Sequence, residues 1–118
     1  MSTVHIDRLL DTCIKQGASD LHLTVGKPPT LRMRGRLIEL KTKVLEPADT
    51  VALMKSIAPE RAQSELQEEG SADFGFAYGE EARFHVSIFR QKGNTALVLR
   101  QIPNELMGIS EIGLPEIV

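Results

Sequence analysis

Residues 17–25 read Gly-Ala-Ser-Asp-Leu-His-Leu-Thr-Val, and this is the stretch that decides the fold. From Asp20 onward apolar and polar residues alternate, which is typical of a strand with one buried face. Gly17 precedes this strand and can take the left-handed conformation that ends a helix. Pro28-Pro29 follows the strand and ends it, because proline has no N–H to donate to a strand ladder. The stretch therefore predicts a helix end, a strand and a sharp corner.

A second and a third strand follow the corner. Residues 30–34 alternate again, and Gly35 favours a tight turn from which residues 36–40 return as the next strand. Three arginines lie in this part of the chain, and they fit either a phosphate or acidic partner or a solvated strand face: Arg32, Arg34 and Arg36.

Helices are predicted on both sides of these strands. Residues 4–16 place apolar side chains at helical spacing, and Ser2 or Thr3 can cap the start of this helix. Pro47 fits the first turn of a second helix. A third helix is expected from Glu60 to Glu69.

Strand periodicity returns after Gly70. Residues 72–78, 82–88 and 95–102 each read as a strand, and Lys92-Gly93-Asn94 predicts a hairpin turn between the last two. Beyond Pro103 we expect a loop and short helical segments.

Composition indicates one soluble, cytoplasmic domain. The chain has 118 residues and a net charge of −2, so no overall charge attracts nucleic acid or an anionic membrane. Cys13 is the only cysteine, which excludes an intrachain disulfide and suits a reducing compartment. The first residues show neither a basic lead nor a long apolar run, so we expect no secretory signal and no membrane span.

Motifs for independent catalysis are missing. A phosphate-binding loop requires G-x-x-x-x-G-K-[ST], whereas the only Gly-Lys pair, Gly26-Lys27, is followed by Pro28. The histidines lack metal-ligand spacing, and the serines lack a nucleophile context. We therefore expect no catalytic residue and no metal site in this segment, and no enzyme activity from it alone.

Two strand arginines, Arg83 and Arg100, are the candidate site residues. If their strands form a hairpin about Gly93, antiparallel pairing brings both arginines towards the same end. Their guanidinium groups suit phosphate oxygens. The alternative is a surface salt bridge with Glu80, Glu81 or Asp73, which contributes little.

A series of short motifs runs along nearly the whole chain. It comprises Gly17-Ala18-Ser19-Asp20-Leu21-His22, Pro28-Pro29, Asp73-Phe74, Ala82-Arg83-Phe84, Gln91, Leu99-Arg100-Gln101-Ile102-Pro103 and Gly113-Leu114-Pro115-Glu116. In order and spacing the series resembles the amino-terminal domain of pilus-retraction (twitching motility, PilT-type) ATPases in the type II/IV secretion ATPase superfamily.

The resemblance implies an α+β fold, a PAS-like curved antiparallel sheet with helices packed on it, over residues 1–112. Residues 113–118 would begin the linker to a RecA-like ATPase core. The parent protein would be a cytoplasmic homo-hexameric motor at the inner membrane that uses ATP and Mg²⁺ and powers type IV pilus retraction or type II secretion. Its partners would be the RecA-like cores of its own and the neighbouring subunit and an inner-membrane platform protein, with no nucleic acid.

Within the resemblance, Arg83 and Arg100 match positions from which arginines approach the phosphates of a nucleotide in trans. The chain departs from the retraction branch at His85, where arginine is common, and at Ser87, where asparagine is common. A stand-alone PAS-like ligand sensor and a plain protein-interaction module are the alternative functions. The sensor would retain a small ligand, whereas the interaction module would show no nucleotide dependence.

Overall fold

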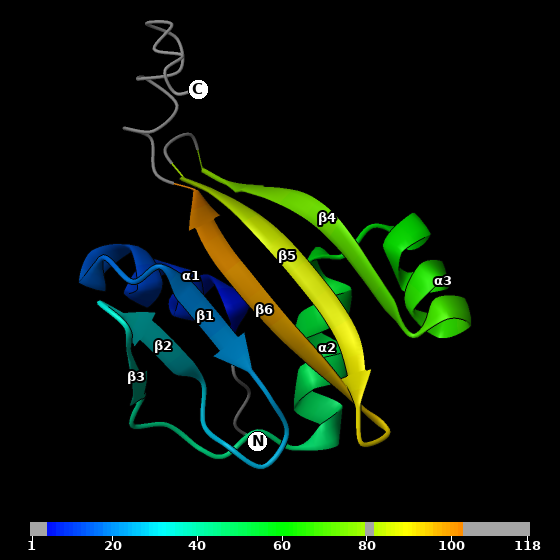
Figure 1. Ribbon diagram of the computed structural model, residues 1–118, viewed down its shortest axis with the longest axis horizontal. Coiled ribbons are helices and arrows are strands. Elements are labelled where there is room, and N and C mark those ends of the chain that lie inside the picture. The colour runs from blue at the N-terminus through cyan, green and yellow to red at the C-terminus, as the bar shows by residue number, and fades with distance from the viewer. Residues whose placement is uncertain (1–4, 80–81, 103–118) are drawn as a thin grey trace, which may run out of the picture.

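A computed structural model describes residues 5–79 and 82–102 of the chain (Figure 1). Its elements, in chain order, are α1 (Ile6–Gln16), β1 (Asp20–Leu23), β2 (Thr30–Met33), β3 (Arg36–Glu39), α2 (Pro47–Ile57), α3 (Glu60–Glu69), β4 (Ser71–Tyr78), β5 (Ala82–Gln91) and β6 (Asn94–Ile102). Each of these elements was predicted from the sequence pattern, to within a few residues at its ends.

The strands form one six-stranded antiparallel sheet in the order β3-β2-β1-β6-β5-β4. Two three-stranded meanders, β1–β3 and β4–β6, are joined where β1 pairs with β6. The expected α+β class with an antiparallel sheet is confirmed.

Alternate rows of the sheet form the hydrophobic core. In one row Leu21 lies opposite Leu31 on one side and Leu99 on the other, and the row continues through Val86 to Phe74. All five side chains are buried, so removal of this apolar surface from water stabilises the sheet.

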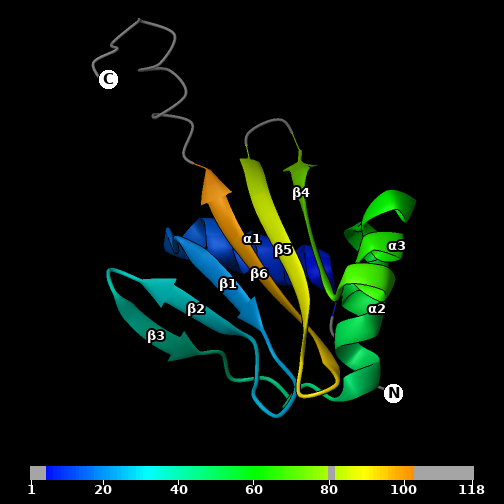
Figure 2. The ribbon, with the colours of Figure 1, turned by 45° about the vertical axis from the view of Figure 1, so that its right-hand side comes forward.

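All three helices cover the same face of the sheet, as Figures 1 and 2 show. α1 contributes Leu10 and Cys13 to the core, α2 contributes Leu53, and α3 contributes Ala62 and Leu66. Within residues 5–79 and 82–102 the opposite face carries no helix and is mainly polar, and it is called the open face below.

Two local predictions were wrong. The first helix begins at Ile6 with an extended His5 at its N-cap, so Ser2 and Thr3, which lie outside the described residues, do not precede the first turn directly. Arg34 lies in the β2–β3 turn with φ 52°, and Arg36 pairs with Met33 rather than sharing a face with Arg32. The three arginines therefore do not form one strand face.

Residues 1–4 and 103–118 lie outside the described part of the chain. The predicted boundary at residues 112–113 and the short helical segments after Pro103 fall there. In the described residues, none of the helices has the length and apolar character needed to cross a membrane.

The glycine that ends α1 offers a test of the decisive stretch. Gly17 has φ 69°, and its N–H donates to the carbonyl oxygen of Ile14. We expect Gly17→Ala to lower the free energy of unfolding by about 1 kcal/mol, because an L side chain is strained at this φ. Gly75→Ala is the matched control in urea unfolding, since Gly75 has no left-handed φ and open space around its Cβ position. Equal losses of unfolding free energy in both variants would contradict a special requirement for glycine at position 17.

Cys13 gives a pH-dependent test of the core. The thiol is fully buried, and burial, followed by the charge of Asp20, raises its pKa to about 11. The native protein should react slowly with a thiol reagent at pH 8 and fully once unfolded in guanidinium. Because the unfolded thiol, with a pKa of 9.0, ionises first, stability should fall between about pH 9 and 11. The free energy of unfolding of the Cys13→Ala variant should fall less steeply over this pH range. Identical stability–pH profiles for the variant and the wild type would contradict the contribution of Cys13.

Candidate functional site

A polar row crosses the open face at the level where β1 begins. Strand register places Arg32, Asp20, Arg100 and His85 side by side on β2, β1, β6 and β5. Residues directly opposite one another in antiparallel strands point to the same face, so this row places Asp20 between two arginines, with His85 beyond Arg100.

Asp20 is the buried member of this row. Its side chain is 7% exposed, and its Oδ2 lies 3.5 Å from Nε of Arg100, whose side chain is 72% exposed. A buried carboxylate is costly unless it is paired, so Arg100 offsets the desolvation of Asp20. The contact uses Nε, and the terminal nitrogens of the guanidinium are not part of it.

Arg83 lies diagonally from Arg100 on the same face. In the β5–β6 ladder Arg83 pairs with Ile102 and His85 pairs with Arg100. Arg83 is therefore two residues along β5 from the residue directly opposite Arg100. The expected meeting of both at one end of the hairpin is confirmed. Such diagonal neighbours are about 7–8 Å apart at their Cα atoms, within reach of two long side chains.

The sequence left a surface salt bridge as the alternative for both arginines, and the structure gives a different result for each. Arg100 pairs with Asp20 and not with Asp73. Glu80 and Glu81, the other acids considered, lie outside the described residues. Among residues 5–79 and 82–102, Arg83 forms no ion pair, and it is exposed.

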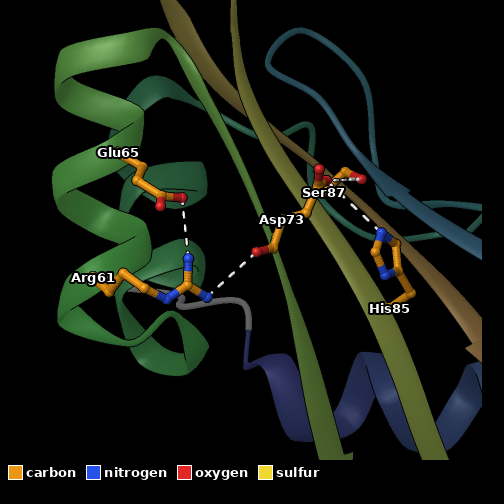
Figure 3. A network of polar contacts seen from close by, with 5 residues as sticks. All are labelled: Arg61, Glu65, Asp73, His85 and Ser87. Atoms are coloured by element: carbon orange, nitrogen blue, oxygen red, sulfur yellow. Dashed lines mark hydrogen bonds and ion pairs between the residues drawn. The ribbon is translucent and has the colours of Figure 1, made fainter.

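Asp73 belongs to a second polar cluster on the same face, shown in Figure 3. Ser87 lies opposite Asp73 in the β4–β5 ladder and donates a hydrogen bond of 2.7 Å to its Oδ1. Nε2 of His85 lies 3.8 Å from the same oxygen. Both side chains of this long His85–Asp73 contact are more than half exposed, so its contribution is small.

The cluster is not arranged for nucleophilic catalysis. Asp73 lies between Ser87 and His85, whereas a nucleophile needs the imidazole as its direct hydrogen-bond partner. Arg61 approaches from α3, where its Nη1 pairs with Glu65 at 3.1 Å and its Nη2 donates to the backbone oxygen of Asp73 at 3.5 Å. These contacts tie α3 to the edge strand.

Within the described residues, no group of histidine, cysteine and acidic side chains is arranged to hold a metal ion. His22 lies half-buried on β1, and its Nε2 is buried without a hydrogen-bond partner in the described structure. A single imidazole does not make a metal site.

Sequence reasoning missed Asp20 as a member of the site. Its place in the polar phase of a strand predicted an exposed residue, and only the long-range pairing of β1 with β6 brings Arg100 over it. The one available signal was the position of Asp20 at the first residue of a short strand, which does not by itself indicate burial.

Comparisons with known proteins agree with this architecture. No family model matches the chain. The chain is 35% identical over 112 residues to the type IV pilus retraction ATPase PilT of Pseudomonas aeruginosa, covering 95% of the chain and 33% of that protein. The type IV pilus ATPase PilU of the same organism is 29% identical over 98% of the chain and 30% of its own length. The chain thus spans about a third of the length of these relatives.

Solved structures give the same result. The crystal structure of the pilus retraction motor PilT with bound ADP superposes with a TM-score of 0.79 at 38% identity, covering 85% of this chain and 29% of that one. The ATPase DotB of Legionella pneumophila superposes with a TM-score of 0.73 over 87% of this chain and 30% of its own, but at 22% identity this likeness shows the fold alone.

The chain is accordingly an amino-terminal domain of the type II/IV secretion ATPase superfamily. The relatives PilT and PilU are both type IV pilus ATPases, and the likeness to each extends over nearly the whole of this chain.

The Arg100–Asp20 pair predicts a stability difference between the two site arginines. We expect Arg100→Ala to lower the free energy of unfolding by about 1–2 kcal/mol, because it leaves a buried carboxylate without its cation. Arg83→Ala should stay within about 0.5 kcal/mol of wild type, as an exposed substitution does. Urea unfolding followed by circular dichroism measures both.

A double-mutant cycle separates the pair from other effects. The variant carrying both Asp20→Asn and Arg100→Gln should be more stable than the sum of the single losses predicts. Additive losses would show that the two side chains do not interact.

Proposed function

We propose that this chain is the amino-terminal, nucleotide-contacting and oligomerisation domain of a hexameric ATPase that powers type IV pilus retraction or type II secretion. The observation that carries the proposal is the likeness to PilT over nearly the whole chain, including a structure of that motor with bound ADP. In the full-length protein we expect a G-x-x-x-x-G-K-[ST] loop downstream of Val118, in a RecA-like core that binds ATP and Mg²⁺. This domain alone would not hydrolyse ATP.

The mechanism follows from where the arginines lie. Arg83 and Arg100 share the open face near the end of β6, and the chain enters residues 103–118 from that end. When the RecA-like core of a neighbouring subunit approaches this face, the guanidinium groups reach the phosphate charge of its nucleotide. ATP then favours the closed arrangement of subunits, because that state alone has the arginine–phosphate contacts.

Asp20 acts as a positioning residue in this mechanism. Its contact with Nε of Arg100 restricts the side chain, and the guanidinium remains largely exposed and accessible to a phosphate. A restrained guanidinium loses less entropy on binding phosphate than a freely rotating one. An anionic partner beside an arginine also weakens its attraction to phosphate, so Asp20 limits how strongly the closed state is favoured.

The remaining parts of the proposal concern the whole assembly. The parent protein would form a homo-hexamer in the cytoplasm, peripheral to the inner membrane, and would act on an inner-membrane platform protein without binding nucleic acid. The similarity to two pilus ATPases supports a motor domain in preference to a stand-alone ligand sensor or a general interaction module.

Steady-state ATPase activity of the full-length protein tests the arginine role. We expect Arg83→Ala and Arg100→Gln each to lower kcat by at least about tenfold, because each removes charge stabilisation at the phosphates. Arg36→Ala is the matched control, since Arg36 is an exposed strand arginine away from the site. Because Arg100 also stabilises the fold, thermal unfolding must be followed for each variant. Wild-type kcat in folded Arg83→Ala and Arg100→Gln proteins would contradict the role.

A further inference from the structure

The tip of the β5–β6 hairpin carries a second surface, at the opposite end of these strands from Arg83 and Arg100. Two hollows meet there, and both are lined by Asn94 and Thr95. The larger, about 420 Å³, lies between the hairpin and helices α2 and α3. The smaller, about 180 Å³, lies between the hairpin and the loop that follows β1. In Figures 1 and 2 the tip lies beside α2 and that loop.

Positive charge collects at these hollows. Lys55 and Arg90 line the larger one, and Lys27 and Lys92 line the smaller one. No acidic residue of the described chain lines either hollow, although acidic residues outnumber basic ones by 16 to 14 in the sequence. The hairpin tip is therefore a cationic surface on a chain of negative net charge.

Within the described residues, these four cations have no ion-pair partner. The ion pairs of residues 5–79 and 82–102 all involve other side chains. Arg90 pairs with Thr95 in the ladder, so it faces the helix-covered side, whereas Lys92 lies in the turn itself with φ 55°. The four charges thus extend around the tip rather than along one face.

The larger hollow also has an apolar floor. Val51 and Met54 of α2 and Leu66 of α3 line it, together with Gln63 and Gln67. The amide of Gln63 already donates a hydrogen bond of 2.9 Å to the backbone oxygen of Ala58. Such a surface can take an apolar side chain while the amide of Gln67 hydrogen-bonds to a peptide backbone. A simple anion would use the cations but not this floor.

We propose that the tip of the β5–β6 hairpin binds an acidic segment of a partner protein, with an apolar side chain between α2 and α3 and carboxylates at Lys27, Lys55, Arg90 and Lys92. Charge complementarity selects the acidic residues, and the recessed floor selects a polypeptide over a flat anionic membrane. The proposal does not depend on the nucleotide role of Arg83. That residue lies roughly 20 Å from Arg90 along β5, at the rise of a strand.

A peptide-binding measurement tests this surface. The probe is a fluorescein-labelled peptide of alternating Glu and Leu, and its control has Gln in place of every Glu. Fluorescence anisotropy with the intact chain should give saturable binding of the Glu peptide and at least about tenfold weaker binding of the Gln peptide. Binding should weaken with added salt, because exposed charges are screened.

Two charge-reversed variants locate the site. Arg90→Glu with Lys92→Glu should weaken binding of the Glu peptide by at least about tenfold. The matched control is Arg34→Glu with Arg36→Glu, which reverses two charges at the β2–β3 turn, where Arg34 has a similar φ of 52°. This control should bind within about twofold of wild type, since it has the same net charge but an intact tip. If the first variant unfolds, Lys27→Gln with Lys55→Gln replaces it.

Three outcomes would overturn the proposal. One is the absence of saturable binding to the wild-type chain. Another is an equal loss in the tip variant and in the β2–β3 control, which would indicate long-range charge alone. The third is binding to phosphatidylglycerol vesicles that depends on Arg90 and Lys92 while peptide binding does not, which would assign the tip to a membrane surface.

Discussion

The pairing of β1 with β6 is the constraint on which the structure depends. It joins two locally formed meanders into one sheet, with Leu21 opposite Leu99 in the core and Asp20 opposite Arg100 on the open face. Because these strands lie far apart in sequence, their pairing has a large loop-closure cost that burial of the Leu21–Leu99 row must offset. The same register that completes the core therefore sets the geometry of the arginine site.

This coupling gives Arg100 a structural role besides the nucleotide contact proposed for it. A residue in the polar phase of a central strand is normally exposed, yet Asp20 is buried because its neighbours on β2 and β6 flank it. Its carboxylate needs a cation, and Arg100 supplies one through Nε. The side chain that would contact phosphate is thus also a stability determinant, whereas Arg83 has no ion pair among the residues that the structure describes. A loss of ATPase activity in an Arg100 variant has to be compared with its loss of stability. For an Arg83 variant this comparison is not needed.

Local patterns in the sequence were sufficient for the elements but not for their long-range arrangement. Alternation predicted β1 and β2, Gly17 predicted the end of α1, and Lys92-Gly93 predicted the last hairpin, because each depends on backbone preferences of adjacent residues. The hairpin register also follows from its turn, so the proximity of Arg83 and Arg100 was predictable. The β1–β6 pairing and the burial of Asp20 were not, since they arise between segments with no local signal for each other. Arg34 was misplaced because the short β2–β3 connection requires a positive φ there, which takes it out of the strand.

The long β5–β6 hairpin carries two kinds of electrostatic surface, one at each end. At the end with Arg83 and Arg100, charge is partly compensated by Asp20 and shares the open face with polar side chains. At the tip, Arg90 and Lys92 are uncompensated within the described structure and adjoin an apolar floor. The β5–β6 ladder runs from the Arg83–Ile102 pair to the Gln91–Asn94 pair, so one continuous antiparallel pairing joins the two surfaces. A partner held at the tip would therefore be connected through this ladder to the nucleotide contact proposed for the arginines.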